Sequence, residues 1–253
     1  MKLYNVDEFN KAYSSDFILN AEEEGDRVYS VNAMGPVKKY NFDPYSHYFI
    51  NKARESKQVL EIGCGFGFMT SSILNGPRSP TVTANDMDVR HLAAVINNVD
   101  QEKHSNLILA PGKVPDDLDF SESKFDIIGA ICVTHFLTPK KIAETFSKVY
   151  KWLKKGGEFV FVNASIYNSR CASLTNNIEE KAEKGVQWAG EVKNFWETHP
   201  EDKRNFPNYL NFAILNDYAR LTKDIGFKIS KLEYFSWRKD TPDKSYLGGI
   251  LVK

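Results

Sequence analysis

The sequence predicts an α/β fold in which a parallel sheet is covered by helices on both faces. From about residue 57, segments typical of strands alternate with segments in which apolar residues recur every three or four positions. The segment 125–133 is almost entirely apolar, as expected of a strand that is buried on both faces. Glycines at alternate positions, 63–67, directly follow the first predicted strand. Strands that alternate with helices are joined by crossover connections, which favours a doubly wound sheet.

Each element is predicted by a local signal. The segment 139–153 carries Ile142, Phe146 and Val149 at helical spacing, and we expect Gly156 to provide a left-handed cap after it. The turn 75–77, Asn-Gly-Pro, ends a helix that begins at Phe68. The other predicted strands are 58–62, 81–85, 107–109, 158–162, 227–234 and 246–252, and the other predicted helices are 89–99 and 212–225.

Two regions lie outside this alternation. Residues 1–52 form an N-terminal extension that we expect to be a helical cap, and residues 53–253 contain an insertion at about 165–212. The insertion is a lid over a substrate pocket, a dimer contact or a segment that simply packs on the domain. Its aromatic side chains, including Trp188 and Trp196, favour the lid. A single helix is predicted there from the apolar residues at helical spacing, Leu174, Ile178, Ala182, Val186, Ala189, Val192 and Trp196.

Composition limits the classes of partner. Lys plus Arg and Asp plus Glu each number 33, so the formal net charge is zero. Nucleic-acid binding is therefore not favoured, because it usually requires a basic excess, and a small neutral or zwitterionic substrate fits better. The three cysteines form no CxxC pair, so we expect neither a disulfide framework nor a metal site. The acidic N-terminus and the lack of a long apolar run predict a cytoplasmic protein without a membrane span.

The glycine run at 63–67 predicts a ligand site. Alternate glycines let the backbone turn tightly and approach a ligand closely. Asp86 follows the second strand, where an acid can accept hydrogen bonds from both hydroxyls of a ribose. A dinucleotide is the alternative ligand, but its GxGxxG pattern would require glycine where Phe68 stands. Glu61 would also repel a pyrophosphate, whereas it would attract a cationic amino-acid group.

These segments together resemble class I S-adenosylmethionine-dependent methyltransferases. The resemblance covers roughly residues 57–163 and 213–253, and its motifs occur in order at the family's spacing. The matching stretches are Val59-Leu60-Glu61-Ile62-Gly63-Cys64-Gly65, Ala84-Asn85-Asp86-Met87, Phe125-Asp126-Ile127-Ile128, Leu153-Lys154-Lys155-Gly156-Gly157-Glu158-Phe159 and Ile225-Gly226-Phe227.

The resemblance implies a Rossmann-like seven-stranded sheet whose last strand is antiparallel, with S-adenosyl-L-methionine across the carboxyl ends of the strands. The family often has an acid after the third strand that faces the adenine amine. Here Lys113 stands near that place, and Asp116 or Asp117 are the alternatives. The cofactor-binding residues implied by position are Glu61, Gly63, Cys64, Gly65, Asp86, Met87, Lys113 and Val114.

The implied reaction is direct displacement, in which an acceptor nucleophile attacks the sulfonium methyl group. Such a reaction needs alignment of the two reactants and exclusion of water rather than a metal. His135 follows the fourth strand, where it would serve either as a general base or as a residue that orders the loop. A small-molecule acceptor is favoured. A protein or nucleic-acid acceptor, a non-catalytic binding role and a homodimer remain open.

Overall fold

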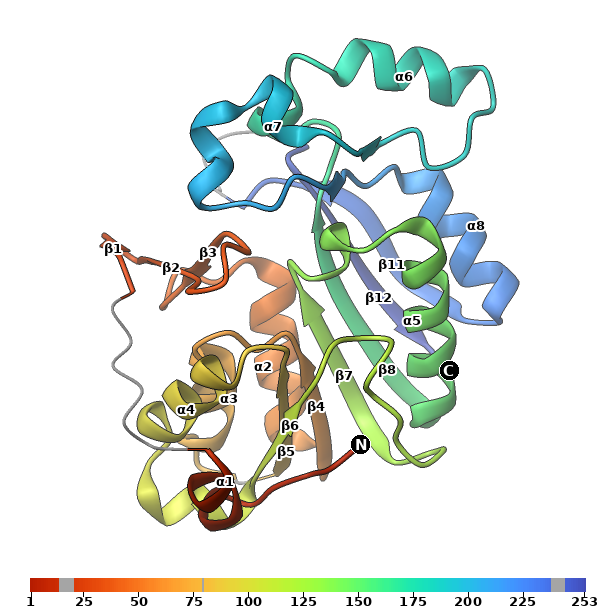
Figure 1. Cartoon of the computed structure of the whole chain (residues 1–253). Helices are drawn as coiled ribbons and strands as arrows, with labels where there is room; N and C mark the ends of the chain where they lie inside the picture. The colour runs from red at the N-terminus through yellow and green to blue at the C-terminus, as the bar shows by residue number, and fades with distance from the viewer. Residues whose placement is uncertain (14–20, 79, 238–243) are drawn as a thin grey trace.

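The computed structural model describes residues 1–13, 21–78, 80–237 and 244–253, and within them one seven-stranded sheet organises the chain (Figure 1). The strand order is β11-β12-β8-β7-β4-β5-β6, and β12 runs antiparallel to both of its neighbours. The chain builds the sheet outward from β4 to β6 and then crosses to β7, which creates a switch point between β4 and β7. The predicted doubly wound sheet is confirmed. Its strands are β4 (Gln58–Ile62), β5 (Thr81–Asp86), β6 (Leu107–Pro111), β7 (Phe125–Ile131), β8 (Leu153–Ala164), β11 (Lys228–Phe235) and β12 (Tyr246–Val252).

Helices cover both faces of this sheet. Helices α2, α3 and α4 lie on one face, and α5 and α8 lie on the other (Figure 1). Each face has its own buried core, represented by Phe49 and Val95 on the first and by Phe146 and Tyr218 on the second. These helices span α2 (Pro44–Glu55), α3 (Phe68–Leu74), α4 (Val89–Asn98), α5 (Pro139–Trp152) and α8 (Leu215–Ile225), and a short 3-10 helix, η1 (Gln101–Asn106), precedes β6.

The N-terminal extension is part helix and part sheet. Helix α1 (Val6–Ala12) lies beside β6, where Tyr4 forms an antiparallel bridge with Leu109. A small antiparallel sheet follows, made of β1 (Glu23–Glu24), β2 (Arg27–Tyr29) and β3 (Pro36–Lys38). The extension thus contains a β-hairpin, which we call the β2–β3 hairpin (residues 27–38), in addition to the expected helices.

The insertion differs from its prediction. Helix α6 (Thr175–Glu183) ends before Gly185 and Trp188, whose φ values are +82° and +55°. The prediction of a single helix that continues to residue 196 is therefore wrong. The chain there forms several short elements around a separate core that includes Phe195 and Phe212. The insertion lies over the carboxyl ends of the central strands (Figure 1). Its other elements are η3 (Ser169–Cys171), β9 (Glu191–Val192), α7 (Phe195–Thr198), η4 (Pro200–Arg204) and β10 (Leu210–Asn211).

The end of α5 also corrects the sequence analysis. The helix ends at Trp152, and its C-cap residue Leu153 is already in extended conformation. Gly156 has a φ of +77° but lies inside β8, so it does not cap the helix. Lys154, which follows the helix, forms an ion pair with Asp126 at 2.6 Å.

Helix α2 is fixed to the sheet by an aromatic ring that lies directly on a glycine. A Cβ atom at Gly129 in β7 would lie within 2.8 Å of three ring atoms of the fully buried Phe49. Gly129→Ala should therefore destabilise the fold by about 1–3 kcal/mol through overpacking, as measured by urea unfolding. Adding Phe49→Leu removes the clashing ring atoms, so the double variant should recover part of the loss. Strictly additive destabilisation would contradict this packing account.

Candidate functional site

The glycine run forms a tight turn between β4 and α3. Gly63, Gly65 and Gly67 all have left-handed φ values, +65°, +53° and +75°. A Cβ atom at Gly63 would lie 2.5 Å from Val133 Cγ2, and a Cβ atom at Gly67 would lie 2.6 Å from Val95 Cγ2. Backbone geometry at all three positions, and close packing at Gly63 and Gly67, therefore require glycine in this turn at the carboxyl end of β4.

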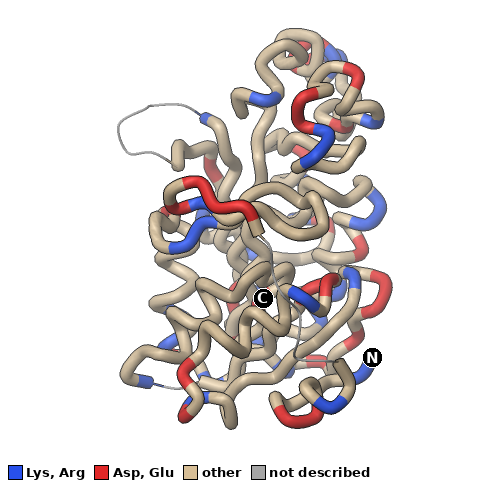
Figure 2. The backbone as a smooth tube through the Cα atoms, turned by 60° about the vertical axis from the view of Figure 1, so that its left-hand side comes forward, with Lys and Arg blue, Asp and Glu red and all other residues tan. Residues whose placement is uncertain are grey.

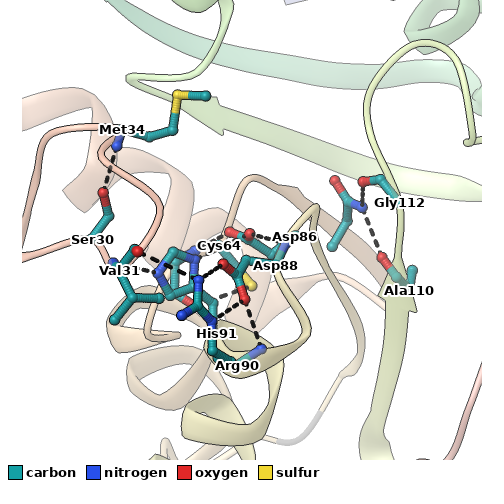
Figure 3. A network of polar contacts seen from close by, with 12 residues as sticks. Ser30, Val31, Met34, Cys64, Asp86, Asp88, Arg90, His91, Ala110 and Gly112 are labelled. Carbon is teal, nitrogen blue, oxygen red and sulfur yellow. Dashed lines mark hydrogen bonds and ion pairs between the residues drawn. The ribbon is translucent and has the colours of Figure 1, made fainter. Parts of the chain in front are cut away.

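Asp86 lies beside this turn at the end of β5, and the residue is only 6% exposed. Its Oδ2 accepts a hydrogen bond from the Gly65 N–H at 2.9 Å, and its Oδ1 accepts one from the Asp88 N–H at 2.8 Å. Oδ1 also lies 3.1 Å from Nδ1 of His91 (Figure 3). The structure thus brings together the glycine turn and the acid that the sequence analysis selected separately.

Glu61 is a second carboxyl group buried beneath the same turn. Thr70 Oγ1 donates to Glu61 Oε2 at 2.5 Å, whereas Oε1 has no hydrogen-bond partner among the described residues. Burial raises the pKa of Glu61 to about 8; the charge of Asp86 also raises it, and the Thr70 hydrogen bond lowers it. An unpaired buried carboxyl oxygen is costly unless a donor or cation reaches it. The pair of acids therefore fits a ligand that carries both an ammonium group and a diol.

Cys64 and Met87 flank these acids. The Cys64 N–H donates to the Asn85 carbonyl at 2.8 Å, which joins the glycine turn to β5. Burial raises the pKa of the Cys64 thiol, so the group is a protonated packing residue rather than a nucleophile. Met87 follows Asp86 and is 43% exposed, which leaves an apolar side chain available at the edge of the site.

The loop after β6 is held by Asn85, whose amide donates to the Ala110 carbonyl at 2.7 Å and to the Gly112 carbonyl at 2.9 Å. Within this loop, Val114 is buried and the side chain of Lys113 is exposed. The two alternative acids both have partners in the protein: Asp117 accepts from the Lys113 N–H at 2.9 Å, and Asp116 pairs with Lys141. The residue that contacts adenine therefore stays a prediction.

His135 lies in a short 3-10 helix, η2 (Thr134–Phe136), at the carboxyl end of β7, and it is buried. The Ala164 N–H donates to its Nδ1 at 3.4 Å, so the neutral ring carries its proton on Nε2. Burial lowers the pKa of His135 to about 4, and a hydrogen bond with Asn163 partly offsets this. A base with so low a pKa accepts protons weakly, which favours the loop-ordering role. The general-base role stays a prediction.

The β2–β3 hairpin and the insertion meet on the same side of the sheet (Figure 1). The Gly35 N–H donates to the Asn205 carbonyl at 2.8 Å, and Arg204 pairs with Glu22. Tyr209 of the insertion reaches the Leu137 carbonyl, at 3.4 Å, in the loop that follows β7. A hollow of about 440 Å³ separates parts of the two segments and is lined by Arg27, Ser169, Arg170, His199, Glu201 and Asp202.

The two tryptophans of the insertion pack on the protein. The Trp188 ring lies 5.4 Å from that of Tyr218, and the Trp196 Nε1–H donates to the Phe206 carbonyl at 2.9 Å. Neither residue lines the hollow between the hairpin and the insertion. Their predicted place beside an acceptor pocket therefore stays a prediction.

His91, which lies 2% exposed on α4 and contacts Asp86, is a site residue that we did not predict from the sequence. The available signal was a polar residue next to Leu92 on the apolar face of this amphipathic helix. Nor did we predict the close approach of the hairpin, where a Cβ atom at Gly65 would lie 3.0 Å from Val37 Cγ2.

Metal-ligand clusters and membrane-spanning helices are both absent from the described residues. No group of three or more His, Cys, Asp or Glu side chains in the described part of the chain could hold a metal ion. No helix within the described ranges is both long enough and apolar enough to cross a membrane.

Comparison with known proteins agrees with this geometry. Residues 59–157 match a family model described as a methyltransferase domain. Over 109 residues the chain is 29% identical to malonyl-[acyl-carrier protein] O-methyltransferase of Halalkalibacterium halodurans, which covers 42% of this chain and 39% of that protein. The chain thus spans less than half the length of the curated relatives it matches.

Solved structures share the fold. An S-adenosylmethionine-dependent methyltransferase from Mesorhizobium loti aligns with a TM-score of 0.60 and 16% identity over 83% of this chain and 98% of that one. The 1,6-didemethyltoxoflavin-N1-methyltransferase of Burkholderia thailandensis, solved with its substrate and S-adenosylhomocysteine, aligns with a TM-score of 0.57 and 16% identity over 85% of this chain and 79% of that one.

The raised pKa of Glu61 generates a prediction about proton release. At about pH 7, below its pKa of about 8, Glu61 is mostly protonated in the free protein. A bound ammonium group favours the ionised carboxylate, so binding should release a proton. Affinity for S-adenosylhomocysteine should therefore rise with pH and level off above about pH 8.

Calorimetry in buffers of different ionisation enthalpy measures this release directly. Glu61→Gln should weaken binding and abolish the buffer dependence, whereas Glu122→Gln, at an exposed acid, should change neither. Undiminished proton release in Glu61→Gln would mean that another group titrates.

Proposed function

We propose that this protein transfers a methyl group from S-adenosylmethionine to a small-molecule acceptor, because residues 59–157 match a methyltransferase domain and the chain shares its fold with S-adenosylmethionine-dependent methyltransferases. The cofactor supplies an activated methyl group on a sulfonium centre. The observation that carries the proposal is the pair of buried acids next to the glycine turn, Glu61 beneath it and Asp86 beside it. Their spacing along β4 and β5 suits a ligand with a cationic amino-acid end and a ribose.

The chain's own residues have three tasks in this proposal. Glu61 offers its unpaired Oε1 to the ammonium group, and Asp86 accepts from the ribose hydroxyls. Gly63 and Gly65 let the backbone lie close to the ligand, since neither carries a side chain; a Cβ atom at Gly63 would collide with Val133, and one at Gly65 would be in tight contact with Val37. The hairpin and the insertion cover the carboxyl ends of the strands, where they exclude water and align the acceptor.

Two observations favour a small acceptor. The contact between Gly35 and Asn205 joins the hairpin to the insertion, which suits an enclosed acceptor site better than an open groove. Basic and acidic positions are interspersed along the whole described backbone rather than gathered on one face (Figure 2). A long polyanion would be expected to need a continuous basic surface. The small-molecule substrate of the Burkholderia thailandensis neighbour points in the same direction.

A methyl-transfer screen tests the acceptor class. The full chain would be incubated with methyl-labelled S-adenosylmethionine, at a concentration near its dissociation constant, and separate pools of small metabolites, proteins and RNA, with Asp86→Ala as the matched control of weakened cofactor binding. We expect label transfer to the metabolite pool only. Transfer to protein or RNA would replace the small-molecule assignment. If label reaches none of the pools even though the cofactor binds, the alternative of a non-catalytic binding protein is favoured.

The ribose contact generates a separate prediction. Hydrogen bonds to a charged group contribute about 1.5–3 kcal/mol, so Asp86→Ala should weaken S-adenosylhomocysteine binding roughly 10- to 150-fold. Asp224→Ala changes an exposed acid on α8 and should leave affinity unchanged. Calorimetry with both variants, after thermal unfolding has shown that they are folded, measures the difference. Full affinity in a folded Asp86→Ala variant would move the ribose contact to another residue.

A further inference from the structure

We propose that His91 is a positioning residue that orients Asp86 for the ribose hydroxyls and links this carboxylate to the β2–β3 hairpin. The inference rests on the proposed function, since it concerns the same cofactor site. It goes beyond that function by assigning a role to a buried histidine on α4 and by connecting cofactor binding to the cap.

The hydrogen bonds of His91 define its tautomer. The Val31 backbone N–H can only donate, and it lies 3.3 Å from Nε2, so Nε2 is the acceptor. In the neutral ring the proton is then on Nδ1, which donates to Asp86 Oδ1 at 3.1 Å. Both ring nitrogens are thereby satisfied, and each serves a different segment of the chain (Figure 3).

This arrangement gives the Asp86 carboxylate a fixed orientation. The main-chain N–H groups of Gly65 and Asp88 hold one oxygen each, and His91 adds a side-chain donor to Oδ1. The Phe66 ring, from the glycine turn itself, lies edge-on against the imidazole with 4.9 Å between ring centres. His91 therefore contacts the turn, the acid and the hairpin at one point.

The hairpin residues near His91 also contact the insertion. Arg90, the neighbour of His91, donates from Nη2 to the Val31 carbonyl at 3.4 Å, so both polar groups of Val31 face α4. Four residues further on, Gly35 donates to the Asn205 carbonyl of the insertion at 2.8 Å. The short stretch from Val31 to Gly35 thus connects Asp86, through His91, to the insertion.

Packing alone does not account for His91. Its neighbours on the buried face of α4, Leu92 and Val95, are apolar and fully buried. A buried imidazole costs free energy unless its nitrogens are paired, so an apolar side chain would fill this position without that cost. The two hydrogen bonds are what the histidine adds, and each can be removed separately.

The first test measures whether His91 acts on the ribose. Binding of S-adenosylhomocysteine and of its 2′,3′-dideoxy analogue would be compared by calorimetry in each variant. The wild type should prefer the natural ligand roughly 10- to 150-fold, because the diol pairs with a carboxylate. In His91→Leu this ratio should fall at least about threefold, since the residue and the hydroxyls are coupled. A residue with only a structural role would weaken both ligands equally.

Two conservative variants separate the two ends of the link. In His91→Asn the amide nitrogen can replace Nδ1 as the donor to Asp86, so the ligand ratio should be kept while Val31 loses its acceptor. In His91→Gln the amide oxygen can reach the position of Nε2, so the Val31 bond should be kept while the ratio falls. Hydrogen exchange at the Val31 amide, with and without S-adenosylhomocysteine, reports the second end. These polar variants keep the test decisive if His91→Leu fails to fold.

His104→Leu is the matched control. Its Nε2 donates to the carbonyls of Ile96 and Val99 at the end of α4, at 3.2 and 3.0 Å, so its loss affects the same helix without reaching Asp86. This variant should lose stability but keep the wild-type ligand ratio. An unchanged ratio in His91→Leu and His91→Gln would overturn the inference and leave the proposed function intact. A wild type that does not bind S-adenosylhomocysteine would overturn the proposed function and the inference with it.

Discussion

The close approach of the backbone at the carboxyl end of β4 is the constraint on which the rest of the site depends. Gly63 leaves room for Val133 after β7, and Gly67 leaves room for Val95 on α4, so the turn packs against both the loop that follows β7 and helix α4. That packing brings the Gly65 N–H to Asp86 at the end of β5. Because the backbone occupies this place without side chains, two acids from neighbouring strands can face a single ligand.

The two acids, Glu61 and Asp86, have different electrostatic environments. Glu61 lies below the turn, where burial disfavours its charged form, and Asp86 lies beside the turn, where three donors surround its carboxylate. A bound cation would therefore stabilise the ionised form of Glu61, whereas Asp86 is already oriented to accept hydrogen bonds from hydroxyl groups. The cap completes this arrangement, since Val31 reaches Asp86 through His91 and Gly35 reaches the insertion.

The central sheet was predicted well from the sequence. Each strand and helix there has a recognisable spacing of apolar residues and is followed by turn-forming residues that end it. Helix α3, for example, spans the residues expected of it. The insertion was predicted poorly because apolar spacing continues past Gly185, although the positive φ values of Gly185 and Trp188 end the helix. The strands of the small N-terminal sheet, β1, β2 and β3, are only two or three residues long, too short to show alternation. The glycine turn and Asp86 follow from motif spacing. His91 does not, because its importance comes from contacts between segments far apart in the chain.

The central claim is that the glycine turn with Glu61 binds a nucleoside whose amino-acid end carries an ammonium group, rather than a dinucleotide. Competition calorimetry with the wild-type chain tests it most directly, by titrating S-adenosylhomocysteine in the absence and in the presence of excess NAD. We expect one binding site for S-adenosylhomocysteine whose affinity NAD does not change, because the Asp86 carboxylate would repel a pyrophosphate and a protonated Glu61 offers it no positive charge. Displacement of S-adenosylhomocysteine by NAD, or tighter binding of NAD on its own, would contradict it.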